Sequence, residues 1–213
     1  MPMHFALNDL KATDRYKLIA GLVVPRPIAF VTTINKDGQH NAAPYSFFNA
    51  FSEDPPLIVL GVGANTRGED KDTGVNIREG NEFVVNLVDE PLAEAMNICA
   101  FDFPPEVSEI DVAGLDLLPC ETIAPSRLKA APVSMECIHY QTLHPGQNRY
   151  LVIGEIKVIH VVDDVIDQET LRVDRDRYAP IGRLFGGGYC RTHDRFEIKR
   201  LSEAEGSALM DGK

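Results

Sequence analysis

The sequence predicts a mainly β protein, a closed or nearly closed antiparallel barrel with peripheral helices. Strand-like segments outnumber helix-like ones, and a tight hairpin signal joins two of them early in the chain. The strands do not alternate strictly with helices, as they would in a doubly wound parallel sheet. Closure into a barrel suits this order because it removes exposed strand edges. The 213 residues fit a single domain over 1–213, with no internal repeat or low-complexity linker.

The first two strands are expected to form a hairpin. Residues 27–34 (PIAFVTTI) precede an NKDG turn signal, and residues 39–44 (QHNAAP) return beside them. Residues 56–63 (PLIVLGVG) are a continuous apolar run bounded by proline and glycine, which is typical of a strand buried on both faces. Gly61 and Gly63 are expected to end that strand with positive φ angles.

Three more strands follow, and the last two are the longest. They cover 82–88, 132–143 and 149–162, and the last alternates over much of its length. A proline- and acid-rich stretch, residues 101–132, separates the first of them from the second and predicts mainly surface loop.

Helices are expected at 13–22, 72–79 and 89–100. The second would begin with Asp72 or Thr73 as its N-cap. The third would begin with Asp89 as its N-cap, because a proline in the first turn and a stripe of apolar residues follow it.

The formal charge of −11 comes from 32 acidic and 21 basic residues. A field of this sign repels phosphate backbones and anionic lipid, so neither nucleic acid nor a membrane is expected as a partner. Any anionic ligand would need a local cluster of cations. The N-terminal residues contain no apolar run like that of a secretory signal, so we expect a soluble, cytoplasmic protein.

Motifs for metal binding and for nucleophilic catalysis are missing from the sequence. The cysteines are scattered without a C-x-x-C pair, and the histidines form no H-E-x-x-H, so we expect no metal site. No G-x-S-x-G is present, and no acid, base or nucleophile stands out. G-x-G at 61–63 lacks the third glycine of a dinucleotide fingerprint, since Thr66 stands there.

The stretch 41–56, NAAPYSFFNAFSEDPP, has the features of a flat heteroaromatic site. Ala43 and Pro44 would let a ring approach the backbone, while Ser46 and Asn49 would bond its polar edge. Phe47 and its aromatic neighbours would form walls. The same aromatic residues would equally suit the core of a barrel, which is the commoner role.

A second stretch, residues 65–79, gathers cations and hydroxyls at the start of a predicted helix. Arg67, Lys71 and Thr73 together with free N–H groups would suit a phosphate monoester. A solvated polar loop is the alternative, since nearby carboxylates partly cancel the cations.

Taken together, these motifs resemble the flavin reductase-like group of FMN-binding split-barrel proteins. The resemblance covers nearly the whole chain and rests on P-R-P-I-A, P-Y-S-F-F-N and K-D-T-x-x-N-I in this order. It implies a six-stranded Greek-key split barrel and a homodimer with FMN near the subunit interface. Two departures are visible. The loop before K-D-T lacks a serine that is frequent there, and Phe185 stands where the pattern has glycine.

The resemblance also implies which residues contact the flavin. Those that line the flavin would be Thr32, Thr33, Asn41, Ala43, Pro44, Ser46 and Asn49. The phosphate side would be held by Lys71, Asp72, Thr73 and Asn76, with Arg67 as a helper. His160 and Tyr189 would close over the ring.

Three functions follow as hypotheses. The first is an oxidoreductase that takes a hydride from NADH or NADPH onto FMN and passes electrons to a small-molecule or protein acceptor. The second is an FMN-binding electron carrier that is reduced by a protein partner, for which an acidic surface would suit basic partners. The third is an all-β binding domain without flavin. In the first two the flavin does the chemistry, so no catalytic side chain is expected.

Overall fold

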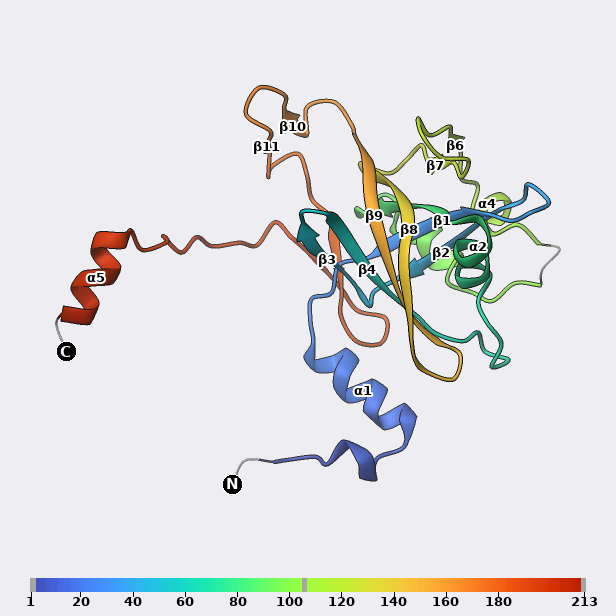
Figure 1. Cartoon of the computed structure of the whole chain (residues 1–213), viewed down its shortest axis with the longest axis horizontal. Helices are drawn as coiled ribbons and strands as arrows, with labels where there is room; N and C mark the ends of the chain where they lie inside the picture. Colours follow the sequence, from blue (N-terminus) through green and yellow to red (C-terminus); the bar gives the residue numbers. More distant parts are fainter. Residues whose placement is uncertain (1–2, 105–106, 212–213) are drawn as a thin grey trace.

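The computed structural model describes residues 3–104 and 107–211, and its centre is one antiparallel sheet of seven strands (Figure 1). The strand order is β2-β1-β5-β8-β9-β4-β3. These strands are β1 (Ala29–Ile34), β2 (His40–Tyr45), β3 (Phe48–Glu53), β4 (Pro56–Val62), β5 (Glu82–Leu87), β8 (Val133–Gly146) and β9 (Arg149–Val161).

The sheet curls into a nearly closed barrel. Its two edge strands, β2 and β3, are consecutive in the chain, so the two edges of the sheet are joined by a two-residue corner, residues 46–47. The Gly61 N–H donates to the Phe47 carbonyl (2.7 Å), which fixes this corner against β4. The prediction of a mainly β barrel is confirmed. The added strand is β3, which the sequence had indicated only as a ligand-binding stretch.

Apolar side chains form two clusters, one on each face of the sheet. Val31, Leu60 and Phe83 belong to the cluster inside the barrel. Phe30 belongs to the outer cluster, which packs beneath α3 (Ala93–Ile98) and α4 (Glu109–Val112). Neighbours such as Phe30 and Val31 serve different clusters because successive strand side chains point to opposite faces.

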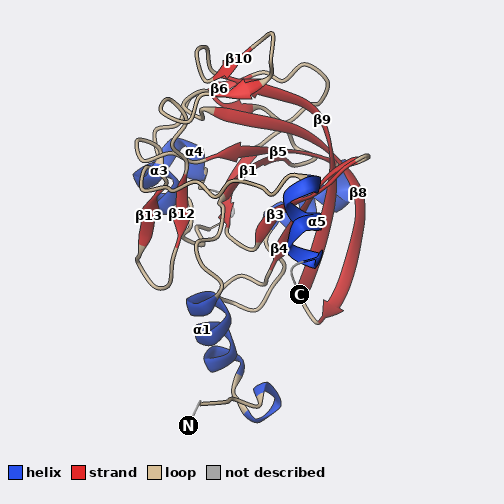
Figure 2. Cartoon of the chain, turned by 90° about the vertical axis from the view of Figure 1, so that its left-hand side faces the viewer, coloured by secondary structure: helices blue, strands red, loops and turns tan. Residues whose placement is uncertain are grey.

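The remaining elements are short or peripheral (Figure 2). The helices are η1 (Leu7–Asp9), α1 (Ala12–Leu22), α2 (Asp72–Gly80) and α5 (Glu203–Asp211). Three small ribbons complete the chain: β6 (Leu117–Leu118) with β7 (Arg127–Leu128), β10 (Ile166–Asp167) with β11 (Arg172–Val173), and β12 (Ile181–Arg183) with β13 (Tyr189–Arg191).

The first and last described segments of the chain both leave the barrel. The α1 helix projects from one side, and the segment leading to α5 extends from another (Figures 1 and 2). These two arms carry exposed apolar side chains, among them Tyr16, Leu22, Phe196 and Ile198. Among the described residues, no helix is long and apolar enough to cross a membrane.

Several local predictions need correction. Gly61 and Gly63 do not have positive φ angles; a Cβ on Gly61 would lie 2.9 Å from the Phe47 Cβ, so close packing explains the glycine. The α2 helix begins at Asp72 with Lys71 as its N-cap, and no side chain caps it. The α3 helix is shorter than predicted, although the Asp89 carboxylate accepts from the Leu92 N–H (3.2 Å) just before it.

The stretch 101–132 is more than surface loop. It contains α4 and the β6–β7 ribbon, and its Leu128 is fully buried. Polar contacts tie it to the sheet: Thr32 Oγ1 donates to the Ser126 carbonyl (2.7 Å), and Asn86 Oδ1 accepts from the Leu128 N–H (2.9 Å). Such contacts satisfy backbone groups that a free loop would leave to water.

Gly154 in β9 makes a testable packing contact. A Cβ at this position would lie 2.3 Å from Cζ of the fully buried Phe83. We expect Gly154→Ala to lower the free energy of unfolding by about 1–3 kcal/mol, because overpacking forces the ring or the strand to shift. Denaturant unfolding measures this. Gly146→Ala is the control, since its Cβ would meet nothing within 4 Å; an equal effect of the two variants would contradict the packing argument.

Candidate functional site

A cavity of about 150 Å³ lies where β2 meets the start of α2, and we call it the α2 cavity. Asn41 and Thr73 join its two sides, with the Asn41 side-chain amide 3.0 Å from Thr73 Oγ1. The two segments that the sequence predicted to share one ligand therefore meet. The other lining residues are Ala43, Tyr45, Asn65, Arg67, Glu69, Asp70, Lys71, Asp72, Cys99, Phe101, Asp102, Phe103 and Glu109.

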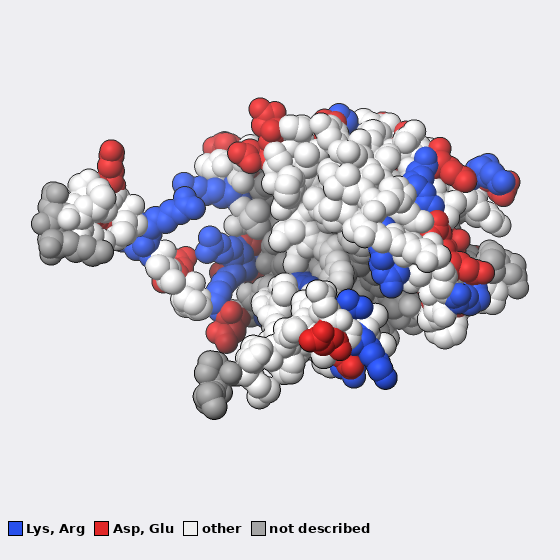
Figure 3. All heavy atoms as spheres, turned by 60° about the horizontal axis from the view of Figure 1, so that its bottom comes forward, with Lys and Arg blue, Asp and Glu red and all other residues white. Residues whose placement is uncertain are grey.

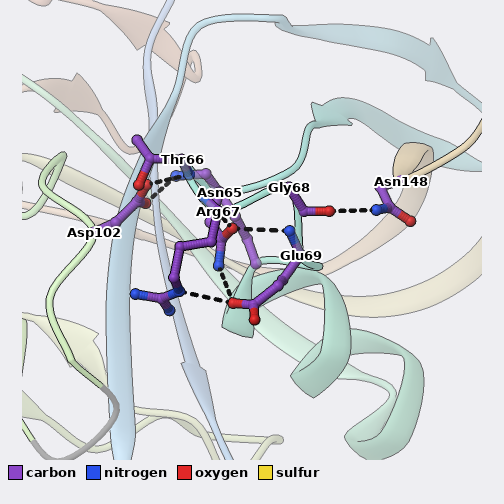
Figure 4. Close-up of polar contacts among 8 residues, drawn as sticks. Asn65, Thr66, Arg67, Gly68, Glu69, Asp102 and Asn148 are labelled. Atoms are coloured by element: carbon purple, nitrogen blue, oxygen red, sulfur yellow. Dashed lines mark hydrogen bonds and ion pairs between the residues drawn. The ribbon is translucent and has the colours of Figure 1, made fainter.

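Two donors at the rim of the α2 cavity would suit an anion, and a carboxylate already accepts from both; Figure 4 shows the Thr66 contact. The Thr66 backbone N–H donates to Asp102 Oδ2 (2.7 Å), and Lys71 Nζ donates to Asp102 Oδ1 (2.9 Å). Burial acts to raise the pKa of Asp102, but the Lys71 and Thr66 hydrogen bonds outweigh it and lower that pKa. Asp102 is therefore ionised at neutral pH.

The loop that carries these donors is organised by Asn65. Its Oδ1 accepts from the backbone N–H groups of Arg67 and Glu69, both at 2.9 Å. Gly68 completes the turn with a φ of +82°, a conformation that side chains disfavour. Arg67 pairs with Glu69 (2.8 Å) and is half exposed (Figure 4). Its guanidinium is therefore held beside the cavity by a carboxylate.

Tyr45 supplies an orphan donor to the same cavity. The residue is 6% exposed, and its hydroxyl has no hydrogen-bond partner in the part of the chain that the structure describes. Burial raises the pKa of this hydroxyl, although the neighbouring Thr73 hydroxyl opposes the shift. A buried hydroxyl without a partner is costly. An acceptor atom of a ligand would satisfy this hydroxyl.

A larger cavity of about 630 Å³ adjoins the α2 cavity, since Asn41 and Asp72 line both. Asn76 also lines it, and its amide donates to Thr33 Oγ1 (3.0 Å). Thr33 therefore supports the α2 helix from β1. Carboxylates and amides dominate this lining, so the larger cavity suits hydroxyl groups better than an anion.

A third cavity, of about 260 Å³, lies at the corner after β2, and we call it the corner cavity. Ser46, Phe47 and Asn49 line it, as the sequence predicted for one ligand site. Tyr45 lines the α2 cavity and Ser46 lines the corner cavity, so consecutive residues of the chain line the two cavities. The other lining residues are Ile19, Val23, Pro25, Arg26, Pro27 and Phe48.

Arg26 is the organising residue of the corner cavity. The residue is 6% exposed, and its guanidinium donates to the carbonyls of Ala20 (2.5 Å), Val23 (2.8 Å) and Leu184 (3.0 Å). It also contacts Ser46 Oγ at 3.4 Å. These partners join the end of α1, the β12–β13 hairpin and the corner after β2.

Five of the predicted residues lie outside the linings of these three cavities: Thr33, which contacts Asn76, and four others. Thr32 and His160 lie beneath the 117–128 segment, on the sheet face that carries Glu136. Pro44 is paired with Phe30 on β1. Tyr189 lies on β13, where the Arg183 guanidinium is 4.5 Å from its ring centroid.

His160 instead belongs to a buried junction around Glu136. Glu136 is fully buried, and its carboxylate accepts from Glu121 N (2.6 Å), Thr122 N (2.8 Å), Thr122 Oγ1 (2.5 Å) and His160 Nε2 (2.6 Å). Burial acts to raise the pKa of Glu136, but the hydrogen bonds of Thr122, Glu121 and His160 outweigh it and lower the pKa to about 2. Cys120 lies beside this carboxylate, and burial followed by the Glu136 charge raises its pKa to about 12.

Cys120, Glu136 and His160 place one ligand atom each within 4.8 Å of one another. The four hydrogen bonds already use the acceptor positions of the carboxylate, and the thiol is protonated at neutral pH. The cluster is therefore a structural junction that fixes the 117–128 segment on β8 and β9.

Sequence patterns did not indicate three residues that line these cavities: Asp102, Arg26 and Tyr45 with its hydroxyl donor. Asp102 is 31 residues from Lys71 in the chain, so no local pattern links them. An arginine between two prolines, in P-R-P, was a signal for Arg26, because a charged residue next to a buried strand needs partners.

Comparison with known proteins defines the class: the protein is a flavin reductase-like oxidoreductase with a split-barrel fold. The chain belongs to the family of the flavin reductase like domain, whose model matches residues 21–182. An uncharacterized protein of Aquifex aeolicus is 40% identical over 197 residues, which cover 92% of this chain and 100% of that protein.

Two solved structures are similar to the chain over most of its length. The 2-nitrobenzoate 2-nitroreductase NbaA of Pseudomonas fluorescens is 43% identical, with a TM-score of 0.87, and the match covers 94% of this chain and 98% of that chain. Nitrilotriacetate monooxygenase component B of Bacillus cereus is 35% identical, with a TM-score of 0.86, covering 93% of this chain and 99% of that one.

Proposed function

We propose that this protein binds FMN and uses it to carry electrons from NADH or NADPH to a second substrate. The observation that carries the proposal is the meeting of β2 and the start of α2 at one cavity, through Asn41 and Thr73. The family and the two similar solved structures support flavin redox chemistry. When bound, the flavin supplies the redox chemistry, and the protein supplies binding and orientation.

The residues present fit a phosphorylated flavin. Lys71 and the Thr66 N–H would hold the phosphate, because an ammonium and a loop amide are typical phosphate ligands. The Tyr45 hydroxyl, which has no hydrogen-bond partner among the described residues, would donate to an oxygen of the ligand. Ser46 and Asn49 would position the polar edge of the ring, with the exposed Phe47 ring as a wall of the corner cavity.

Tyr45 gives a test of this fit. We expect Tyr45→Phe to weaken FMN binding about fivefold, which equals about 1 kcal/mol, because one donor is lost. The flavin-free protein should be equally stable or more stable, since the variant removes a buried hydroxyl without a partner. Titration of FMN fluorescence and denaturant unfolding measure the two effects. Tyr140→Phe, at an exposed site, is the control. Unchanged FMN affinity in Tyr45→Phe would remove Tyr45 from the site.

Stopped-flow mixing tests the electron donor. The protein as purified, reconstituted with FMN, is mixed with NADH or NADPH without oxygen. Bleaching of the flavin absorbance at a rate that rises with nicotinamide concentration supports the oxidoreductase. Failure with both donors, together with reduction by a protein partner, would support the electron carrier instead. A protein that stays colourless after incubation with FMN and gel filtration would overturn both.

Stopped-flow mixing can also identify the second substrate, which is the electron acceptor. Reoxidation of the reduced protein by 2-nitrobenzoate would assign a nitroaromatic acceptor. This compound is the first to test because the chain is 43% identical to a 2-nitrobenzoate 2-nitroreductase.

On the face drawn in Figure 3, acidic and basic side chains are interspersed around a largely uncharged middle. This face does not offer the uniform acidic patch that would favour a basic protein partner.

A homodimer is part of the proposal. The two arms present exposed apolar residues, including Leu22 at 77% and Phe196 at 85% exposure, which a second copy would cover. Because α1 ends beside the corner cavity, a partner covering this arm would place the flavin near the interface. Sedimentation equilibrium of the full chain tests this, and a monomer at all concentrations would contradict it.

A further inference from the structure

Asp102 occupies the donors that a phosphate would use. Its two carboxylate oxygens bridge the Thr66 N–H (Figure 4) and the Lys71 ammonium, at 2.7 and 2.9 Å. The bridge is not a local turn, because Asp102 follows α3 and lies 36 and 31 residues away from its two partners. Its side chain is only 15% exposed. The pair is therefore shielded from the screening that weakens surface ion pairs.

The other cation of the loop does not relieve this competition. Arg67 is paired with Glu69 at 2.8 Å, and that pairing is part of the turn built by Asn65. Lys71 is therefore the cation that a phosphate would need, and its partner in this structure is Asp102. A phosphate oxyanion and Asp102 cannot both be held at the same two donors, because their like charges would repel in a partly buried site.

We infer that Asp102 is a resident competitor for the flavin phosphate, which keeps FMN exchangeable and prevents tight, permanent binding. The inference rests on the proposed function. A phosphate with up to two negative charges and three oxygens displaces the single carboxylate. The displaced Asp102 turns toward solvent, next to the exposed Phe101. On release of FMN the carboxylate returns to both donors, so neither is left without a partner.

Flavins with and without a phosphate separate this role from a supporting one. Riboflavin lacks the phosphate, so it has no group that must displace Asp102. Removing the carboxylate should therefore strengthen FMN binding and leave riboflavin binding unchanged. If Asp102 instead orients Lys71 for the phosphate, removing it should weaken FMN binding.

The experiment compares Asp102→Asn and Asp102→Ala with the unaltered full-length protein. Binding of FMN and riboflavin is measured by fluorescence titration, and FMN release by stopped-flow dilution. We expect the FMN dissociation constant to fall about tenfold in both variants, mainly through slower release, with the riboflavin constant within twofold of the original. Asp116→Asn is the charge-matched control, since its side chain is 77% exposed and its partner is Lys129.

Two outcomes overturn the inference. One is FMN affinity that is unchanged or weaker in both variants. The other is an equal gain for riboflavin or in Asp116→Asn, which would point to a general field effect. If the unaltered protein binds neither flavin, the proposed function fails along with this inference. If it binds FMN and the variants do not tighten that binding, only the inference fails. Thermal unfolding of each variant verifies that the fold is retained.

Discussion

Lys71→Glu will abolish retention of FMN while leaving the barrel folded. The substitution removes the ammonium at the α2 cavity and puts a second carboxylate beside Asp102. Loss of a charge-assisted hydrogen bond, added to repulsion of the phosphate, is worth about 3 kcal/mol or more. FMN affinity should therefore fall about a hundredfold or more. Fluorescence titration and the flavin absorbance left after gel filtration measure it.

Two further variants separate the loss of the Lys71 ammonium from the added carboxylate and from a general change of charge. Lys129→Glu makes the same charge change at an exposed lysine, 61% accessible and paired with Asp116, and should leave FMN binding unaltered. Lys71→Met removes the charge without adding a carboxylate, so its loss should be smaller than that of Lys71→Glu. Equal FMN retention in Lys71→Glu and the unaltered protein would end the assignment of the phosphate to the α2 cavity.

Glu136→Ala will destabilise the protein by about 3–5 kcal/mol. The carboxylate is 0% exposed, and its removal leaves two backbone N–H groups, the Thr122 hydroxyl and His160 without their acceptor. Breaking a buried charged network from one side has this order of cost. Denaturant unfolding measures it. Glu197→Gln is the surface control, since this glutamate side chain is 88% exposed. A loss below about 1 kcal/mol would mean that the junction does not hold the 117–128 segment.

The same carboxylate predicts a dependence of stability on pH. Glu136 has a pKa of about 2 in the folded protein, against an ordinary value of 4.5. Between these values the unfolded chain binds the extra proton and the folded protein does not. The contribution to stability is therefore complete above about pH 4.5 and is lost as the pH falls toward 2. Thermal unfolding of Glu136→Gln should depend less on pH over this range. Parallel curves for the variant and the unaltered protein would contradict this.

The sequence was sufficient for the strands that bury apolar residues regularly. The regions 27–34 and 149–162 were found because apolar side chains repeat along them, and the structure has β1 and β9 there. It was insufficient for β3, whose six residues are mostly exposed and show no alternation. The 101–132 stretch is mainly loop, as predicted, but the sequence did not indicate its α4 helix or its β6–β7 ribbon. Its order comes from hydrogen bonds to Thr32 and Asn86, which lie far away in the chain.

Part of the site could be predicted and part could not. Lys71 and Thr73 were found because they surround a helix start, a local feature. Thr32 and Thr33 were both assigned to the flavin, but neighbouring strand residues point to opposite faces. In the structure Thr33 contacts Asn76 on α2, while Thr32 faces the 117–128 segment. The position of Asp102 beside Lys71 depends on the path of the chain after α3, and sequence periodicity does not predict that path.

The Arg26 guanidinium links the N-terminal arm to the corner cavity through hydrogen bonds. It contacts the Ala20 carbonyl in the last turn of α1, the Leu184 carbonyl and the Ser46 hydroxyl at once. A displacement of the N-terminal arm would therefore be transmitted to the corner cavity. A partner that docks on this arm would then alter flavin affinity through the linkage. By reciprocity, flavin would alter the affinity of the partner by the same factor. Binding of a partner and binding of flavin would then be thermodynamically coupled.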